Sequence, residues 1–232
     1  MGLFGPPNVE KLRDKRDLKG LAKALADDDA GVRDDAARAF GDIGDPAAAK
    51  LIVERMIGTD DEAKADSGGA ALRAIGDAAV PELVDGLRHA PADKRPAYGA
   101  FLARMGETGV PALLEASSDA DPLQRAGAAL SLGLVGTPAA TERLVDMYRA
   151  DDEMEVRGMA MLGLANNKLP VAYDTFVAAL GGDDPLTRAL GAMGLGALGD
   201  PRGADPLRRA AGQDPDDRVR GAAQDALDGL PG

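Results

Sequence analysis

The sequence holds a few sets of residues whose types and spacing could serve chemistry. One is a group of carboxylates at helical spacing, which could bind a divalent cation or exchange protons. Its members are Asp34, Asp35, Asp42 and Asp66. Because Arg38 and Arg73 lie among them and no fixed coordination loop is present, a solvated, ion-paired face is the simpler interpretation.

The single histidine, His89, could act as a general base. It closes a helix-like segment, however, where a solvated histidine also interacts favourably with the helix dipole. The chain has no cysteine, which excludes disulfides, thiolate zinc sites and a cysteine nucleophile. One histidine also excludes multi-histidine metal sites. The sequence therefore predicts no catalytic residue, no metal and no cofactor.

A basic residue recurs along the chain with successive spacings of 31, 31, 30, 32, 31 and 32 residues. Its positions are Arg33, Lys64, Arg95, Arg125, Arg157, Arg188 and Arg220. So narrow a period indicates a repeat architecture. A row of arginines could bind anions, but such a row would not need to recur in every unit, so a structural role is the simpler interpretation.

Each period contains two helical patterns. The first carries the basic residue, is rich in alanine and ends in glycine, as a helix closed by a left-handed residue does. The second is often opened by proline, as in 46–57, 138–149 and 170–180. Acidic turns such as 27–29 and 151–153 precede the first pattern and favour the positive end of its dipole. No segment has the pattern of a strand.

The order of acidic turn, Val-Arg, Ala-Ala, Ala-Leu-Gly and Asp-Pro resembles the HEAT repeat, specifically the prokaryotic HEAT-like repeats also found in phycobilisome lyases. The best matches are Arg33–Pro46, Arg157–Leu164 and Arg188–Pro201. The resemblance implies an all-α, right-handed α-solenoid of about seven antiparallel helix pairs, with the arginine-bearing helices on the concave face. We expect a lead-in over residues 1–16 and a single solenoid over 17–232.

In this repeat family the basic residue pairs with an acidic residue of a neighbouring turn. The resemblance therefore implies a structural ladder through Arg33, Arg125, Arg157, Arg188 and Arg220. For Arg157 and Arg188 we expect partners in the acidic turns 151–153 and 183–184. In the second copy, Gly68 and Gly69 weaken the helix by about 1 kcal/mol each, which predicts a kink or a local loosening near Gly68.

The variable positions of the arginine-bearing helices predict a divided concave face. Its N-terminal part is a polar groove formed by Asp34, Asp35, Arg38, Asp42 and Asp66. Its C-terminal part is an apolar patch formed by Leu130, Leu134, Met159, Leu162, Leu190 and Met193. An exposed apolar patch usually marks an interaction site, and this one would fit an amphipathic helix or an apolar tail. The alternative is a rotated register, in which the same side chains are ordinary core.

Charge narrows the possible partners. There are 39 acidic against 27 basic side chains, divided as 21 against 16 in residues 1–116 and 18 against 11 in residues 117–232. Neither half offers the basic stripe that nucleic acid requires. The longest uncharged run, 126–141, is shorter than the roughly 20 residues of a membrane span. Without a signal-peptide pattern either, we expect a cytoplasmic protein with no membrane span.

The enzymes that share this kind of repeat fit the sequence poorly. A deoxyhypusine hydroxylase-like protein needs several His-Glu motifs, and a HEAT-like DNA glycosylase needs a basic cleft with stacking aromatics. The sequence predicts a non-catalytic scaffold that binds another protein or peptide. The alternative is an accessory subunit of a lyase or isomerase that handles a tetrapyrrole or a similar ligand.

Overall fold

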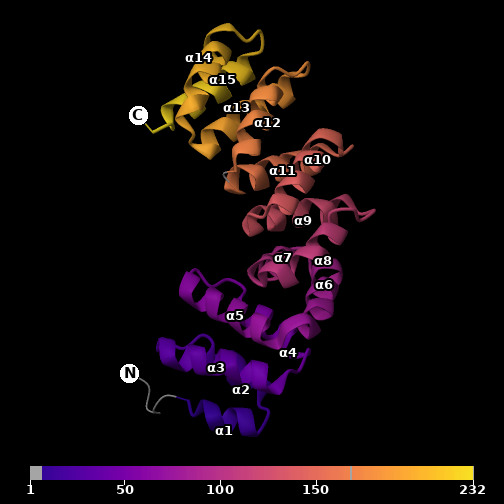
Figure 1. Ribbon diagram of the computed structural model, residues 1–232, viewed down its shortest axis with the longest axis vertical. Helices are drawn as coiled ribbons and strands as arrows, with labels where there is room; N and C mark the ends of the chain where they lie inside the picture. Colours follow the sequence, from indigo (N-terminus) through magenta and orange to yellow (C-terminus); the bar gives the residue numbers. More distant parts are fainter. Residues whose placement is uncertain (1–6, 168, 232) are drawn as a thin grey trace. The chain divides into compact units, whose positions relative to one another are not determined.

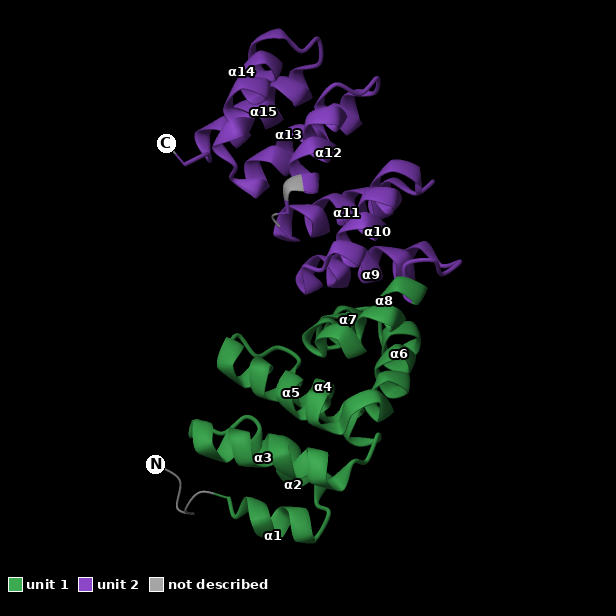
Figure 2. Ribbon diagram, viewed as in Figure 1, with its two compact units in different colours: residues 1–115 green, residues 116–232 purple. Residues whose placement is uncertain are grey.

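The computed structural model of the protein describes residues 7–167 and 169–231, and these form helices and turns with no strand among them. The chain divides into two compact units, residues 1–115 (unit 1) and 116–232 (unit 2), shown in Figure 2. Each unit consists of stacked helix pairs. The predicted all-α architecture is therefore confirmed.

Unit 1 has two layers of helices (Figure 1). One layer holds α1 (Val9–Asp14), α3 (Ala30–Ile43), α5 (Glu62–Ile75) and α7 (Arg95–Arg104). The other holds α2 (Leu18–Ala24), α4 (Ala48–Met56) and α6 (Val80–His89). Short 3-10 turns at Gly76–Ala79 and Gly106–Thr108 precede α6 and α8 (Val110–Ala116), whose last residue is the first of unit 2.

Unit 2 repeats this arrangement. Its first layer consists of α9 (Pro122–Val135), α11 (Met154–Asn167), α13 (Pro185–Leu198) and α15 (Asp217–Asp228), each packed beside the next. Its second layer consists of α10 (Pro138–Ala150), α12 (Pro170–Leu180) and α14 (Ala204–Gln213). A 3-10 turn at Pro201–Gly203 leads into α14.

The helix ends follow the local signals in the sequence. Side chains of Asp29, Asp121 and Asp184 cap α3, α9 and α13 by accepting backbone N–H groups of the first turn. The same three helices end at Gly44, Gly136 and Gly199, whose φ angles of 62°, 66° and 66° are left-handed. The predicted glycine ends are thereby confirmed for these helices.

The core of unit 2 lies between its two layers. Leu132, Leu164 and Leu195 of the first layer are fully buried, as are Leu144 and Phe176 of the second. Within the first layer the packing is close because small residues face each other. A Cβ atom built on Gly133 of α9 would lie only 2.4 Å from the Cα of Gly163 of α11. Glycine at both positions lets the two helix backbones touch.

The weak helix propensity at Gly68 does not interrupt α5, which runs as one helix from Glu62 to Ile75. Both glycines are buried. A Cβ on Gly68 would lie 3.0 Å from atoms of Met56 and Phe101, and one on Gly69 would lie 3.0 Å from Cβ of Arg104. Tertiary packing against α4 and α7 thus offsets the low helix propensity of the pair.

Residues 1–6 of the expected lead-in lie outside the described residues. The described part of that segment includes α1, which packs beside α2 and α3. In the part of the chain that the structure describes, no helix has both the length and the apolar character needed to cross a membrane.

Candidate functional site

The recurring arginines bind the turn that precedes their own helix. In five of them Nη1 donates to a backbone carbonyl six residues earlier, and in most of these also to the next one, whereas Arg95 donates from Nε to the carbonyl of Ala90, five residues earlier. Arg125 donates to Asp119 and Ala120, Arg157 to Asp151 and Asp152, and Arg188 to Gly182 and Asp183. Arg33 and Arg220 make the same contact with Asp27 and Asp214. The arginine therefore closes the turn in every one of these repeats.

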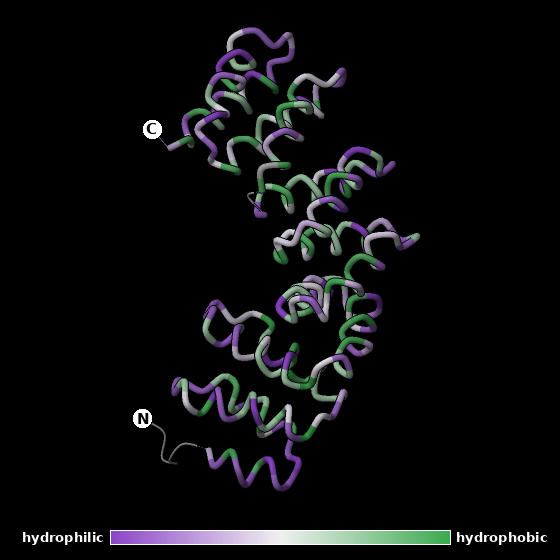
Figure 3. Tube along the Cα trace, viewed as in Figure 1, coloured by the Kyte–Doolittle hydropathy of each residue, from purple (hydrophilic) through white to green (hydrophobic). Residues whose placement is uncertain are grey.

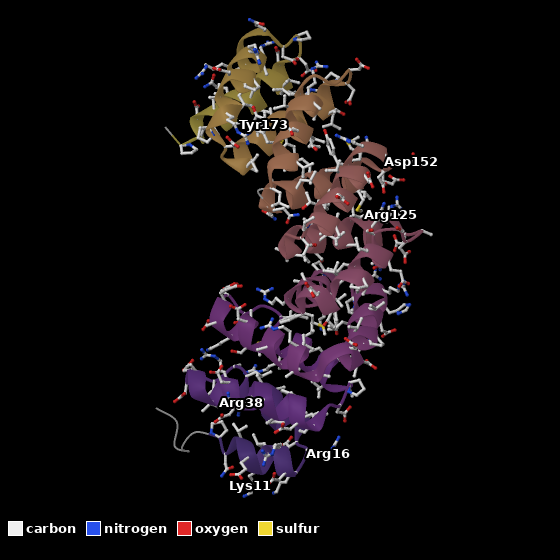
Figure 4. The ribbon with its side chains drawn as sticks, viewed as in Figure 1. Lys11, Arg16, Arg38, Arg125, Asp152 and Tyr173 are labelled. Carbon is white, nitrogen blue, oxygen red and sulfur yellow. The ribbon has the colours of Figure 1, made fainter. Side chains whose placement is uncertain are left out.

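Two of these arginines also bind the next turn. Arg125 donates from Nε and Nη2 to the two carboxylate oxygens of Asp151, at 2.7 and 2.8 Å. Arg188 binds Asp214 in the same bidentate way, at 2.8 and 3.0 Å. The hydrogen bond from each arginine lowers the pKa of its aspartate below the ordinary value, although burial acts in the opposite direction. Figure 4 labels Arg125.

The partners differ from those expected. Arg188 pairs with Asp214 of the following turn, and its contact with the preceding turn is to carbonyl groups rather than to the carboxylates of 183–184. Arg157 contacts turn 151–153 in the same way, through carbonyls. Arg33 uses Nε to donate to the Ser67 hydroxyl at 3.2 Å. The sequence signal for the observed pairs is an aspartate 26 residues after the arginine that also lies six residues before the next arginine, as Asp151 and Asp214 do.

The side of the first layer that faces away from α10, α12 and α14 is here called the free face of unit 2. The predicted apolar patch lies on it. Leu134, Leu162 and Met193 are 55%, 40% and 50% exposed. Leu130, Met159 and Leu190 are half-buried. Each exposed side chain lies two residues from a fully buried leucine of its own helix, such as Leu164 beside Leu162. About 200° of helix rotation separates the two.

The apolar surface is larger than the sequence predicted. Leu123, one turn before Gly127 on α9, is 56% exposed, and Leu186 on α13 is half-buried. Both continue the three- and four-residue spacing of the predicted positions, and that spacing could have identified them. The charged side chains of α9 and α13 are Arg125 and Arg188, and both are engaged in ion pairs. The exposed stripe of these two helices is therefore uncharged. In Figure 3, α9 is coloured mostly from white to green.

Unit 1 has a polar surface at the corresponding helices. Arg38 forms an ion pair with Asp35, and Arg13 lies 3.6 Å from Asp42. These four side chains line one recess between α1 and α3. Asp34 is exposed on the same helix. Asp66 lies on α5, where it is 3.7 Å from Arg104, and does not line that recess. Asp35, Arg38, Asp42 and Asp66 are thus ion-paired at the surface, with Arg38 labelled in Figure 4.

No catalytic arrangement emerges from these residues. His89 accepts or donates a 2.9 Å hydrogen bond with Asp85 one helical turn away, and both side chains are 71% exposed. Among the described residues, no group of three or more His, Asp or Glu side chains is placed to hold a metal ion.

Family models for repeats match most of the chain. A model described as HEAT repeats matches residues 80–165 and 144–228, and one described as PBS lyase HEAT-like repeat matches residues 32–56. The chain therefore belongs to the HEAT-repeat family. A comparison of the sequence with proteins of curated function gave no match.

Solved structures with the same kind of fold include the complex of CpcE and CpcF of phycocyanin lyase from Nostoc sp. PCC7120. The match has a TM-score of 0.54 and 24% identity, and covers 64% of this chain and 98% of that one. Human deoxyhypusine hydroxylase in complex with glycerol matches with a TM-score of 0.45 and 22% identity, over 95% of this chain and 88% of that one. At these identities the likeness concerns the fold.

Proposed function

We propose that the protein is a non-catalytic scaffold that binds an amphipathic helix of a partner protein on the free face of unit 2. The observation that carries the proposal is the exposure of Leu134, Leu162 and Met193 on three successive helices of one layer. Monomeric soluble proteins seldom leave apolar side chains contiguous at the surface unless a ligand or partner covers them.

The composition of this surface favours a helix over a polar ligand. Its side chains are leucines and methionines, and methionine adapts its shape to different partners. An amphipathic helix presents apolar side chains every three or four residues and buries them in such a surface without requiring charged contacts. The HEAT-repeat fold supports this proposal, because solenoids offer extended binding surfaces built from equivalent positions of successive repeats.

The test is capture of partners from native lysate by the intact protein and by the double variant Leu162→Glu with Met193→Glu. Two carboxylates on the free face should abolish capture, whereas the melting temperature should stay nearly unchanged because both positions are exposed. Val171→Glu on α12 is the matched control, since Val171 is 41% exposed on the second layer. Unaltered capture by the double variant would contradict the proposal.

The alternative function is that of an accessory subunit of an enzyme that handles a tetrapyrrole. The likeness to the phycocyanin lyase complex supports it at the level of fold. Mixing the purified protein with bilin distinguishes the two functions. A visible absorbance change that saturates with bilin would favour the enzyme subunit over the peptide-binding scaffold.

A further inference from the structure

Arg157 makes only half of the contacts that its equivalents Arg125 and Arg188 make. Its Nη1 donates to the carbonyls of Asp151 and Asp152, at 2.8 and 3.3 Å, as in the other repeats. Its Nε and Nη2 form no hydrogen bond with any of the described residues. In the two equivalent arginines this edge of the guanidinium group holds an aspartate carboxylate in bidentate fashion.

The sequence explains this difference. The carboxylate that binds each arginine comes from the residue six positions before the next arginine. Asp151 precedes Arg157 and Asp214 precedes Arg220 in this way, but the residue six positions before Arg188 is Gly182. Gly182 still supplies its carbonyl to Arg188, at 3.2 Å, so its backbone occupies the equivalent place. Position 182 therefore has no carboxyl side chain to bind Arg157, and the acidic residues of this turn, Asp183 and Asp184, follow one and two positions later.

A pocket of about 400 Å³ lies at this place within unit 2. Arg157 and Gly182 line it, together with Leu190, Ala178 and the Tyr148 side chain. Tyr148 is only 7% exposed, and its hydroxyl oxygen is buried without a hydrogen-bond partner. Burial raises the pKa of Tyr148, so the hydroxyl is protonated at neutral pH and available as a donor. A buried hydroxyl without a partner is costly, and such a group marks a place where an acceptor fits.

The other polar groups of the pocket are already satisfied or add positive charge. Asp184 accepts hydrogen bonds from Leu186 and Thr187 as the cap of α13. The Thr175 hydroxyl donates to the carbonyl of Val171. Arg149 also lines the pocket, so two guanidinium groups stand against the single carboxylate of Asp184. Asp184 already interacts electrostatically with Arg157, and the lining as a whole carries one positive charge in excess.

We propose that this pocket binds a carboxylate group from outside the chain, held by Nε and Nη2 of Arg157 and by the Tyr148 hydroxyl. The planar fork of a guanidinium group matches a carboxylate in bidentate geometry, as Asp151 and Asp214 already demonstrate in this protein. The apolar part of the lining, with Leu190 and Ala178, would cover a short aliphatic or peptide portion. The carboxylate comes either from a small aliphatic acid or from an acidic side chain of a peptide.

The proposal does not depend on the apolar surface described above, although Leu190 belongs to both. It is tested by following the Nε–H resonances of the arginines by NMR in the intact protein. Butyrate is the probe, and butyramide, which has the same shape without the charge, is its control. The Nε resonance of Arg157 should shift and saturate with butyrate and stay fixed with butyramide. The resonances of Arg125 and Arg188 should not move, because Asp151 and Asp214 already bind the guanidinium groups of these two arginines.

Two variants make the test specific. Tyr148→Phe removes only the unpartnered hydroxyl and should weaken butyrate binding about tenfold, the equivalent of about 1.4 kcal/mol. Gly182→Asp restores the missing carboxyl group and should abolish the response of Arg157. A Cβ at position 182 would lie 3.0 Å from the backbone carbonyl oxygen of Ala179 and 3.0 Å from the side chain of Thr187, so the local backbone must give slightly. Tyr148→Phe therefore provides the independent check.

A blocked peptide of sequence Leu-Leu-Glu-Leu distinguishes the two sources of the carboxylate. Binding of the peptide at least tenfold tighter than that of butyrate would support an acidic side chain, and equal or weaker binding would support a small acid. Inorganic phosphate is the remaining probe. The proposal is overturned if butyrate shifts the Nε resonance of Arg157 no more than that of Arg125. It is also overturned if both variants bind butyrate as tightly as the natural chain does, or if phosphate binds as tightly as butyrate.

Discussion

Asp151 accepts hydrogen bonds from Nε and Nη2 of Arg125, which lies 26 residues earlier on the preceding repeat of unit 2. Its side chain is 9% exposed and that of Arg125 is 17% exposed, so water screens the pair weakly. The same guanidinium group binds the carbonyl of Asp119 at 3.0 Å. One side chain thus ties its own turn to the next, which makes the pair a junction between neighbouring repeats.

Replacing Asp151 by Asn should therefore destabilise the protein. The amide keeps the volume but leaves one buried guanidinium N–H group without an acceptor, at a cost of about 2 kcal/mol. Urea unfolding at neutral pH measures the change. Asp152→Asn is the control, because this exposed carboxylate forms no ion pair among the described residues, and it should alter the free energy of unfolding by less than about 0.5 kcal/mol. Equal changes in unfolding free energy for the two variants would contradict the role of Asp151 as a junction between repeats.

The contribution of Asp151 should also depend on pH. The hydrogen bond from Arg125 lowers the pKa of Asp151 in the folded protein below the ordinary value of 3.8. A carboxyl group whose folded pKa is lowered stabilises the folded state above its unfolded pKa, and this stabilisation is lost as the pH falls through the folded pKa. The difference in unfolding free energy between the natural chain and Asp151→Asn should be constant from pH 7 to about 5 and should narrow below about 4. A difference that does not change down to pH 2.5 would show that charge plays no part.

Two glycines of α9 should respond to alanine in opposite directions. A Cβ on Gly133 would lie 2.4 Å from Gly163 Cα, so Gly133→Ala should push α9 and α11 apart at a cost of about 1–3 kcal/mol. Gly127, six residues earlier, has no atom within 4 Å of such a Cβ. Gly127→Ala should stabilise the helix by up to about 1 kcal/mol. Thermal unfolding monitored by circular dichroism compares the two, and destabilisation by Gly127→Ala would contradict the described packing.

Two residues of α13 that lie two positions apart should distinguish core from surface. Leu195 is fully buried, whereas Met193 is 50% exposed on the free face of unit 2. Leu195→Ala should cost about 2–5 kcal/mol through lost burial and the cavity left behind. Met193→Ala should cost less than about 0.5 kcal/mol. Denaturant titration of both variants measures the free energy of unfolding. A loss for Met193→Ala as large as that for Leu195→Ala would contradict the placement of Met193 at the surface.

Most of the fold could be predicted from the sequence, because its signals are local. The repeat period, the glycine ends at Gly44, Gly136 and Gly199 and the aspartate caps depend on residues within one helix or one turn. Helix propensity alone was insufficient at Gly68 and Gly69, where contacts with Phe101 and Arg104 keep α5 continuous. Such contacts join residues far apart in the sequence.

The sequence by itself determined that the chain is a stack of helix pairs and which residue types fall on each stripe of a helix. Only the tertiary structure decided that Leu162 is exposed and its neighbour Leu164 buried, since the helix rotation relative to the other layer depends on packing. The tertiary structure also decided that Arg188 binds Asp214, because the turn that supplies the carboxylate lies one repeat further on. A one-residue change of spacing places Gly182 where the repeat would otherwise supply a carboxylate to Arg157, and only the surrounding backbone shows that the two positions are equivalent.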